Sequence, residues 1–452
     1  MPPSSAFLLV IVACLQVSHA TDPESSSDAV KSPTNDFIGD QSDKESRQPA
    51  IDAFRIDNLG FRYCSHKDFS GYAASDQDTL RQVLLVHRHG DRTPVVFRQG
   101  DSLADEPFWK FHGYGQLTNR GKERMYILGK IIRHRYEKFT KGSVHKNLRI
   151  SRSSGAPRCI ESAQVFLASF LSLDSPDSPD AEALSWISGC DKLGHLWQPA
   201  SVHTMATSID GMLAEAAECK ALRDEIDNTI EQAPEAQWIH QEFKNEVAPL
   251  KELMGFKMER FMEWSWASDQ MDVERSYFES KLDPRILAVF DRVQEAGRAA
   301  LLAQHSTIKS RRLRSGLLIN DMIENMKKTR QQDQNGPEPK KLLHYSTHDV
   351  NLFSLVALLG NAERFPFTPS YAASLIMELH QDDADEWFVK FFYMPHVPSK
   401  IFEIHVDTCE MDHPKKRCTL EKLEEVLQPY IINKWSSWME ECKNDISKLN
   451  PY

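Results

Sequence analysis

Three short apolar segments of this chain each lead into a segment with helical periodicity, and this pattern limits the folds open to it. Strands that alternate with helices form parallel sheets with helices on both faces. We therefore expect an α/β protein with a doubly wound, mostly parallel sheet. The predicted strands are Val83–His87, Leu148–Ser151 and Leu342–Ser346, and the helical segments begin after Leu117, at Pro157 and at Val350.

The remaining segments differ in composition. The first apolar run is too short to span a bilayer, and Ser18 and Ala20 have the spacing of a signal peptidase site. A polar stretch rich in Ser and Asp follows, which is typical of disorder. The expected divisions are a signal peptide at 1–20, a disordered leader at 21–52, an α/β domain at 53–184 and 341–452, and a mainly helical cap at 185–340.

The charge balance and the first segment limit the partners and the location. The formal net charge is -11, and an acidic surface repels nucleic acid and anionic lipid. No second long apolar run follows the signal, so we expect no membrane span. A signal peptide predicts secretion, with the lysosome as the alternative. The absence of any Asn-x-Ser/Thr acceptor favours secretion over glycan-dependent lysosomal sorting.

Charged residues follow each predicted strand where it ends. Ligands bind outside the carboxyl ends of strands in open α/β sheets, so we expect these residues to converge. Arginine forks match phosphate oxygens, a neutral imidazole can attack phosphorus, and an aspartate can protonate a leaving group. The pattern predicts a phosphate site. Its residues are Arg88, His89 and Arg92 after the first strand, Arg152 after the second, and His348 and Asp349 after the third.

The segment Arg88–Pro94 reads RHGDRTP and resembles the RHGxRxP signature of the histidine acid phosphatase family. The pair His348–Asp349 resembles the distal HD pair of that family. Gly113–Gly121 and Ser151–Ala163 are similar to the two blocks that follow the signature, and the resemblance extends over about Gln82–Cys442. The family fold, a doubly wound sheet with a helical cap, agrees with the pattern of strands and helices.

The resemblance implies a role for each matched residue. His89 would be the nucleophile that becomes phosphohistidine, and Asp349 would protonate the leaving group. The family requires no metal or cofactor, and it is compatible with a homodimer. The substrate would be a small-molecule or peptide phosphomonoester. The implied phosphate-binding residues are Arg88, Arg92, Arg152 and His348.

The chain has eight cysteines, of which Cys14 lies in the predicted signal peptide. Seven remain, so at least one is unpaired or pairs with another chain. The family resemblance implies the disulfides Cys219–Cys442 and Cys409–Cys418, and it leaves the partners of the other cysteines open. These are Cys64, Cys159 and Cys190.

We therefore expect an acid phosphatase that works through a phosphohistidine. Two alternatives are a phytase or inositol polyphosphate phosphatase of the same superfamily, and a non-catalytic secreted binding protein that kept the fold. Simpler structural interpretations apply to several other residues. They are His87 as a strand residue rather than a metal ligand, Asp91 as a solvated or helix-capping residue, Trp264 and Trp266 as core, His203 as buried, and Lys309–Arg314 as a solvated helix surface.

Overall fold

The computed structural model describes residues 69–74, 76–140, 149–172, 197–215, 217–331, 340–362, 368–410 and 413–443. The predicted signal peptide and leader lie outside these residues, as do Cys64 and Cys190. Within the described part of the chain, no helix combines the length and the apolar character needed to cross a membrane.

A mixed seven-stranded sheet forms the centre of the molecule, in the order β2-β3-β1-β4-β5-β6, with β7 paired to β5. Strands β2, β3 and β1 are parallel, and each later pairing is antiparallel. All three strands predicted from the apolar segments are present. The strands are β1 (Leu80–Arg88), β2 (Arg149–Ser153), β3 (Leu342–Thr347), β4 (Ser374–Gln381), β5 (Trp387–Met394), β6 (Phe402–Ile404) and β7 (Cys418–Thr419).

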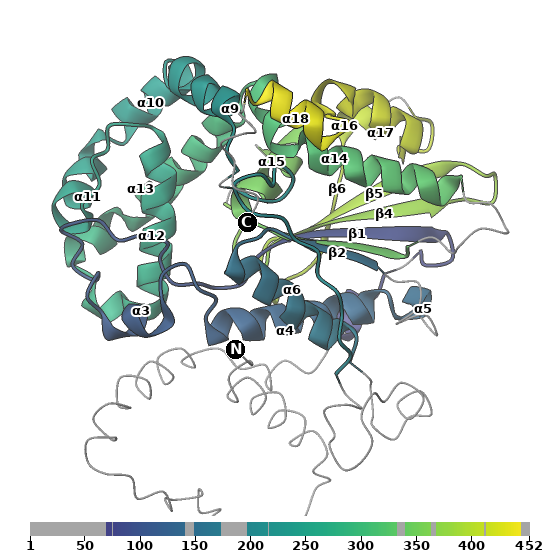
Figure 1. Ribbon diagram of the computed structural model, residues 1–452, viewed down its shortest axis with the longest axis horizontal. Helices are drawn as coiled ribbons and strands as arrows, with labels where there is room; N and C mark the ends of the chain where they lie inside the picture. The colour runs from purple at the N-terminus through teal and green to yellow at the C-terminus, as the bar shows by residue number, and fades with distance from the viewer. Residues whose placement is uncertain are drawn as a thin grey trace, which may run out of the picture.

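Helices cover both faces of the sheet (Figure 1). Helices α4 (Asn119–Arg135) and α6 (Pro157–Phe170) pack together on one face. Helices α14 (Ile308–Arg330), α15 (Asp349–Leu358) and α17 (Leu420–Leu427) lie on the other. The remaining helices near the sheet are α5 (Glu137–Thr140), α9 (Lys220–Glu225), α16 (Asp407–Glu410) and α18 (Trp435–Glu441).

The alternation of side chains along β1 explains why this strand can be apolar throughout. Val83 and Leu85 belong to the cluster formed with α4 and α6, whereas Leu84 and Val86 belong to the cluster formed with α14 and α15. Because successive residues of a strand point to opposite faces, a strand covered on both sides needs apolar residues at every position. Because β1 is buried between two layers of helices, the position of its charged end at Arg88 is fixed relative to the sheet.

Further helices form a separate layer beside the sheet, on the left in Figure 1. They enclose their own apolar cluster, which contains the fully buried Trp109, Phe243 and Trp264. The prediction that Trp264 is a core residue is confirmed. The helices of this layer are α3 (Pro107–His112), α10 (Pro234–Glu242), α11 (Val247–Met254), α12 (Met262–Phe278) and α13 (Pro284–Gln304).

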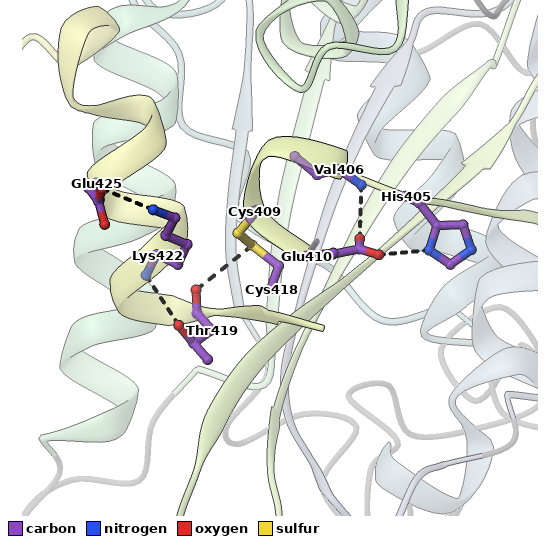
Figure 2. Close-up of a disulfide and its surroundings, with 8 residues drawn as sticks. All are labelled: His405, Val406, Cys409, Glu410, Cys418, Thr419, Lys422 and Glu425. Atoms are coloured by element: carbon purple, nitrogen blue, oxygen red, sulfur yellow. Dashed lines mark hydrogen bonds and ion pairs between the residues drawn. A yellow bond between two sulfur atoms is a disulfide. The ribbon is translucent and has the colours of Figure 1, made fainter. Parts of the chain in front are cut away.

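The two disulfides implied by the family resemblance, Cys219–Cys442 and Cys409–Cys418, are both present. The first links positions 223 residues apart and ties the segment before α9 to the end of α18. The second joins α16 to β7, as Figure 2 shows. Beside it, the Glu410 carboxylate accepts the backbone N–H of Val406, which fixes the turn into α16.

Candidate active site

The pairing of β1 with β3 brings two histidines together. Arg88 lies opposite Thr347 in the parallel register, so the residues that follow them, His89 and His348, leave the sheet side by side. The backbone N–H of His89 donates to the Thr347 carbonyl at 3.0 Å. The two imidazole rings meet edge to face, with centroids 5.6 Å apart. The predicted convergence of these strand ends is therefore present in the structure.

A close backbone approach explains the glycine after His89. A Cβ atom at Gly90 would overlap the backbone carbonyl of Gly121 near the start of α4, and a Cβ at Gly121 would overlap the backbone of Asp91. The Gly90 N–H also donates to Ser162 Oγ of α6 at 3.0 Å. Both glycines are needed because the loop after β1 lies directly on two helices.

The hydrogen bonds of His89 determine which of its nitrogens faces the site. His89 Nδ1 lies 2.8 Å from the Gly90 carbonyl, which can only accept, so Nδ1 carries the proton. The lone pair is then on Nε2, and Arg158 Nε donates to it at 3.1 Å. Burial, together with the positive charge of Arg158, lowers the pKa of His89 well below its ordinary value. The imidazole is thus neutral, and its unprotonated Nε2 faces Arg158.

His348 is held in a defined tautomer as well. Arg158 Nη2 lies 3.3 Å from His348 Nδ1, which must accept, so Nε2 carries the proton and donates to Ser154 Oγ at 2.9 Å. Burial is the main reason that the pKa of His348 lies well below its ordinary value. The next residue, Asp349, begins α15, and its Oδ2 lies 2.8 Å from Arg88 Nη2.

Three arginines surround the His89 ring. Arg88 and Arg92 come from the end of β1 and the loop after it, and Arg158 comes from the first turn of α6. Arg88 Nε and Arg92 Nε are buried and find no hydrogen-bond acceptor among the described residues. Burial would lower the pKa of Arg92, but the nearby Asp269 carboxylate raises it above the ordinary value. Permanently charged forks around an unprotonated ring nitrogen have the charge and the donor geometry to hold a tetrahedral anion.

Comparison with known proteins agrees with this geometry. A sequence model of the histidine phosphatase superfamily (branch 2) matches residues 79–394. The chain belongs to this superfamily. It is therefore a phosphatase, and the family resemblance and the α/β fold class predicted from the sequence are both confirmed.

The relatives include acid phosphatases. Prostatic acid phosphatase of Rattus norvegicus is 28% identical over 363 residues, which cover 79% of this chain and 88% of that protein. Lysosomal acid phosphatase of Xenopus laevis is 27% identical over 384 residues, which cover 83% and 81%. The solved phytase of Citrobacter braakii has a TM-score of 0.54 and 15% identity, over 80% of this chain and 99% of that one, which shows the shared fold.

One predicted site residue of this histidine phosphatase lies elsewhere. Arg152 is directed away from the other arginines, with Nη2 3.9 Å from Asp321 Oδ1 of α14. Ser151 Oγ bonds His344 on the α6 side, so Arg152 points to the α14 side. Arg152 pairs with Tyr345, which pairs with Val86, so it lies two positions short of Arg88 along the sheet. The prediction that Arg152 is the third arginine of the pocket is wrong on this geometry, and Arg158 occupies that position.

The pocket around these residues has a volume of about 540 Å³. Its wall also contains carboxylates and apolar side chains that the sequence interpretation did not assign to a site. Trp266, expected in the core, is 41% exposed and lines the pocket, as does Arg314 of the basic run expected to be solvated. The unassigned carboxylates are Glu215, Asp269 and Asp272, and the apolar residues include Val95, Val96 and Met262.

The remaining sequence interpretations have mixed outcomes. His87 is fully buried and bonds His344 at 2.7 Å, so it is a structural strand residue as expected. Asp91 is not a helix cap, because its carboxylate forms a two-point ion pair with Arg124 of α4. His203 is exposed rather than buried.

Proposed function

We propose that this protein is an acid phosphatase that hydrolyses phosphate monoesters through a phosphohistidine on His89. The observation that carries the proposal is the orientation of His89, whose Nδ1–H is fixed on the Gly90 carbonyl so that the Nε2 lone pair faces the arginines. A neutral histidine with this orientation can attack phosphorus, and the covalent intermediate divides hydrolysis into two easier steps.

The phosphate would be bound by the three arginines around His89 and by His348. In the first step His89 Nε2 forms a bond to phosphorus while the ester oxygen leaves. Arg88, Arg92 and Arg158 stabilise the charge on the non-bridging oxygens, and a preorganised donor of this kind is worth about 3 kcal/mol. Arg158 replaces Arg152 in this scheme because it alone of the two lines the pocket.

Asp349 would supply the proton that the departing alkoxide needs. It lines the pocket at the first turn of α15, and its other oxygen accepts the backbone N–H of Val350 at 2.8 Å, which limits its movement. In the second step water attacks the phosphohistidine, and Asp349 then accepts the proton of that water. The first step needs Asp349 in its acid form, so we expect an acidic optimum.

An inositol polyphosphate phosphatase is a second candidate because of the shared fold, but the charge of the pocket disfavours it. Five arginines and four carboxylates line the same cavity, so cations exceed anions by only one. A substrate with many phosphates needs an excess of cations, because each additional dianion near these carboxylates is repelled. We expect kcat/KM for p-nitrophenyl phosphate to exceed that for phytate by at least about tenfold, and the reverse order would favour the second candidate.

The non-catalytic alternative is disfavoured because His89 and Asp349, the proposed nucleophile and acid, both line the pocket.

The expected location follows from the apolar first segment, which supports entry into the secretory route. Secretion is the expected destination, and the lysosome is the alternative. The relatives named prostatic and lysosomal acid phosphatases are compatible with either destination.

The experiment that tests the proposal is hydrolysis of p-nitrophenyl phosphate at acidic pH with excess EDTA. We compare the wild type with His89→Ala, and with His203→Ala as a matched control, since His203 is exposed and is not part of the pocket wall. Rapid quenching with a radiolabelled substrate would trap an acid-labile phosphohistidine in the wild type. Full activity in His89→Ala, or activity that EDTA abolishes, would contradict the mechanism.

A further inference from the structure

The Asp269 carboxylate bridges two of the pocket arginines. Its Oδ1 lies 3.0 Å from Arg88 Nη2, and its Oδ2 lies 2.8 Å from Arg92 Nη2. Asp269 belongs to α12 of the helical layer, whereas both arginines belong to the end of β1 and the loop after it. Two oxygens of one anion therefore bridge two guanidinium groups, as two oxygens of a bound phosphate would.

The same donors cannot serve the carboxylate and a phosphate ester at once. Arg88 Nη1 is already engaged by the Pro369 carbonyl at 2.9 Å, and Arg92 Nη1 by the Thr93 carbonyl at 3.2 Å. A phosphate that binds the Nη2 groups must therefore compete with Asp269, whereas the buried Nε groups have no acceptor to displace among the described residues. Arg88 Nη2 also lies 2.8 Å from Asp349 Oδ2, so Asp349 shares this donor with Asp269. The side chain of Asp269 is 30% exposed, so it has space to move off the two arginines within the pocket when it is displaced.

We propose that Asp269 is a specificity-determining competitor for the phosphate position, which substrate must displace and which takes up a proton when it is displaced. This inference rests on the proposed function, because it assumes that phosphate binds at Arg88 and Arg92. It adds that the affinity of the site for a dianion depends on pH because Asp269, which takes no part in the chemical step, gains a proton when the dianion binds.

The surroundings of Asp269 explain the proton uptake. In the ion-paired state burial would raise its pKa, but Arg92 and Arg88 hold it below the ordinary value. The acidic and phenolic groups near it are Asp272 on its own helix, Glu215 from the segment before α9, Asp349 of α15, and Tyr371 from the segment before β4. The other cations of the same pocket wall are Arg98, Arg158 and Arg314. Once a dianion takes Arg88 and Arg92, Asp269 loses the two cations that keep it ionised and gains a dianion as a neighbour, so its protonated form is favoured.

A purely structural role for Asp269 predicts the opposite result. If the carboxylate served to hold the arginines in place, its removal would loosen anion binding at every pH. If it competes with the anion, Asp269→Asn tightens anion binding, and most strongly near neutral pH, where the wild-type carboxylate is ionised. The sign of the change therefore separates the two roles.

The test is calorimetric titration of the whole protein with sulfate, whose charge is constant between pH 4 and pH 8. Titration in two buffers of different ionisation enthalpy gives the number of protons taken up. We expect the wild type to take up close to one proton per sulfate at pH 6, with affinity that weakens by up to about tenfold per pH unit. Asp269→Asn should bind sulfate about tenfold more tightly at pH 7 and lose most of the uptake.

Asp272→Asn is the matched control, since it removes the same charge from the same pocket wall, and among the described residues Asp272 forms no ion pair with Arg88 or Arg92. It should keep the proton uptake. Weaker binding by Asp269→Asn, or an uptake that this change leaves intact, would overturn the inference. If the variant does not fold, a wild-type affinity that is independent of pH overturns it equally. A wild type that binds neither sulfate nor phosphate would instead refute the proposed function.

Discussion

Arg158 Nε donates a hydrogen bond to His89 Nε2 across 3.1 Å, so the third arginine of the pocket covers the lone pair of the proposed nucleophile. A nitrogen that accepts this bond cannot attack phosphorus at the same time. We expect Arg158 to turn toward a phosphate oxygen when an ester binds, which exposes His89 at the moment when it is needed. Asp269 pairs with Arg88 and Arg92, so these arginines must also exchange a protein partner for the phosphate.

This relationship predicts that Arg158 contributes to the chemical step and Arg152 does not. Arg158→Ala should lower kcat/KM for p-nitrophenyl phosphate by about 10²- to 10³-fold, as expected for the loss of one charged donor. Arg152→Ala should stay within about threefold of the wild type, because Arg152 contacts Met212 and Asp321 instead of the pocket. Equal losses in the two variants would contradict the assignment.

The difference between these two arginines shows what the sequence could and could not determine. Apolar segments predicted the three strands, and residues next to a strand end, such as His89 and His348, were correctly expected to meet. Arg152 lies inside β2, where the side-chain direction depends on register, and register is set by contacts distant in the sequence. A better signal was available in Pro157, since the residue after a helix-starting proline lies in the first turn of the helix that follows the end of β2.

The pocket residues that the helical layer contributes could not be predicted from the sequence either, and the reason is a different one. Trp264 and Trp266 are two positions apart on α12, and the 3.6-residue repeat sends one into the core and the other into the pocket. Asp269 has no motif around it, and its contact with Arg88 joins positions 181 residues apart. The packing of α12 against the end of β1 decides these contacts, and no local pattern encodes it.

Trp266 should select substrates with an aromatic leaving group. Trp266→Ala is expected to raise KM for p-nitrophenyl phosphate by about fivefold to tenfold, because aromatic contacts contribute about 1 kcal/mol beyond simple burial. KM for glycerol phosphate should change little, since its leaving group is small and polar. Trp238→Ala is a suitable control, as Trp238 is 50% exposed and lines a different cavity. Equal changes for both substrates would argue against this role.

The role of Asp349 is tested by the leaving group. Asp349→Asn should slow hydrolysis of an alkyl phosphate by at least about 10²-fold, because an alkoxide needs a proton as it departs. Hydrolysis of p-nitrophenyl phosphate should slow far less, since nitrophenolate leaves without one. The ratio of the two kcat values is the measurement. If both substrates lose the same factor, Asp349 is not the acid.

The contact between the loop after β1 and α4 should tolerate no side chain at Gly121. Gly121→Ala is expected to lower the free energy of unfolding by about 1–3 kcal/mol, because the new Cβ would push against the backbone of Asp91. It should also lower kcat, since Asp91 follows His89 by two residues. Gly71→Ala is the control, because a Cβ there would meet no atom within 4 Å. Urea unfolding and activity assays check both effects.

Glu274 should make the fold more stable in acid than at neutral pH. This side chain on α12 is 1% exposed, and Gln270 Nε2 donates to its Oε1 at 2.8 Å while also donating to Asp101. Burial, together with the nearby Asp101 carboxylate, raises the pKa of Glu274 to about 9. Two carboxyl groups share one amide donor in a buried position, so one of them remains protonated in the folded state.

The sign of the pH dependence follows from proton counting. Below the pKa of an unfolded glutamate, about 4.3, both states hold the proton, and the stabilisation is fully present. Between that value and about 9, only the folded state holds it, so unfolding releases a proton and stability falls as pH rises. The slope for one such group is about 1.4 kcal/mol per pH unit.

Glu274→Gln should remove most of this slope. An uncharged amide keeps an oxygen for Gln270 and offers an N–H to Asp101, so the variant should equal the wild type near pH 4 and exceed its stability at pH 7 by up to about 4 kcal/mol. Urea unfolding at a series of pH values gives the comparison. Glu279→Gln is the control, since that carboxylate is 60% exposed and pairs with Arg275 at the surface. A wild-type slope that survives in Glu274→Gln would assign the proton to another group.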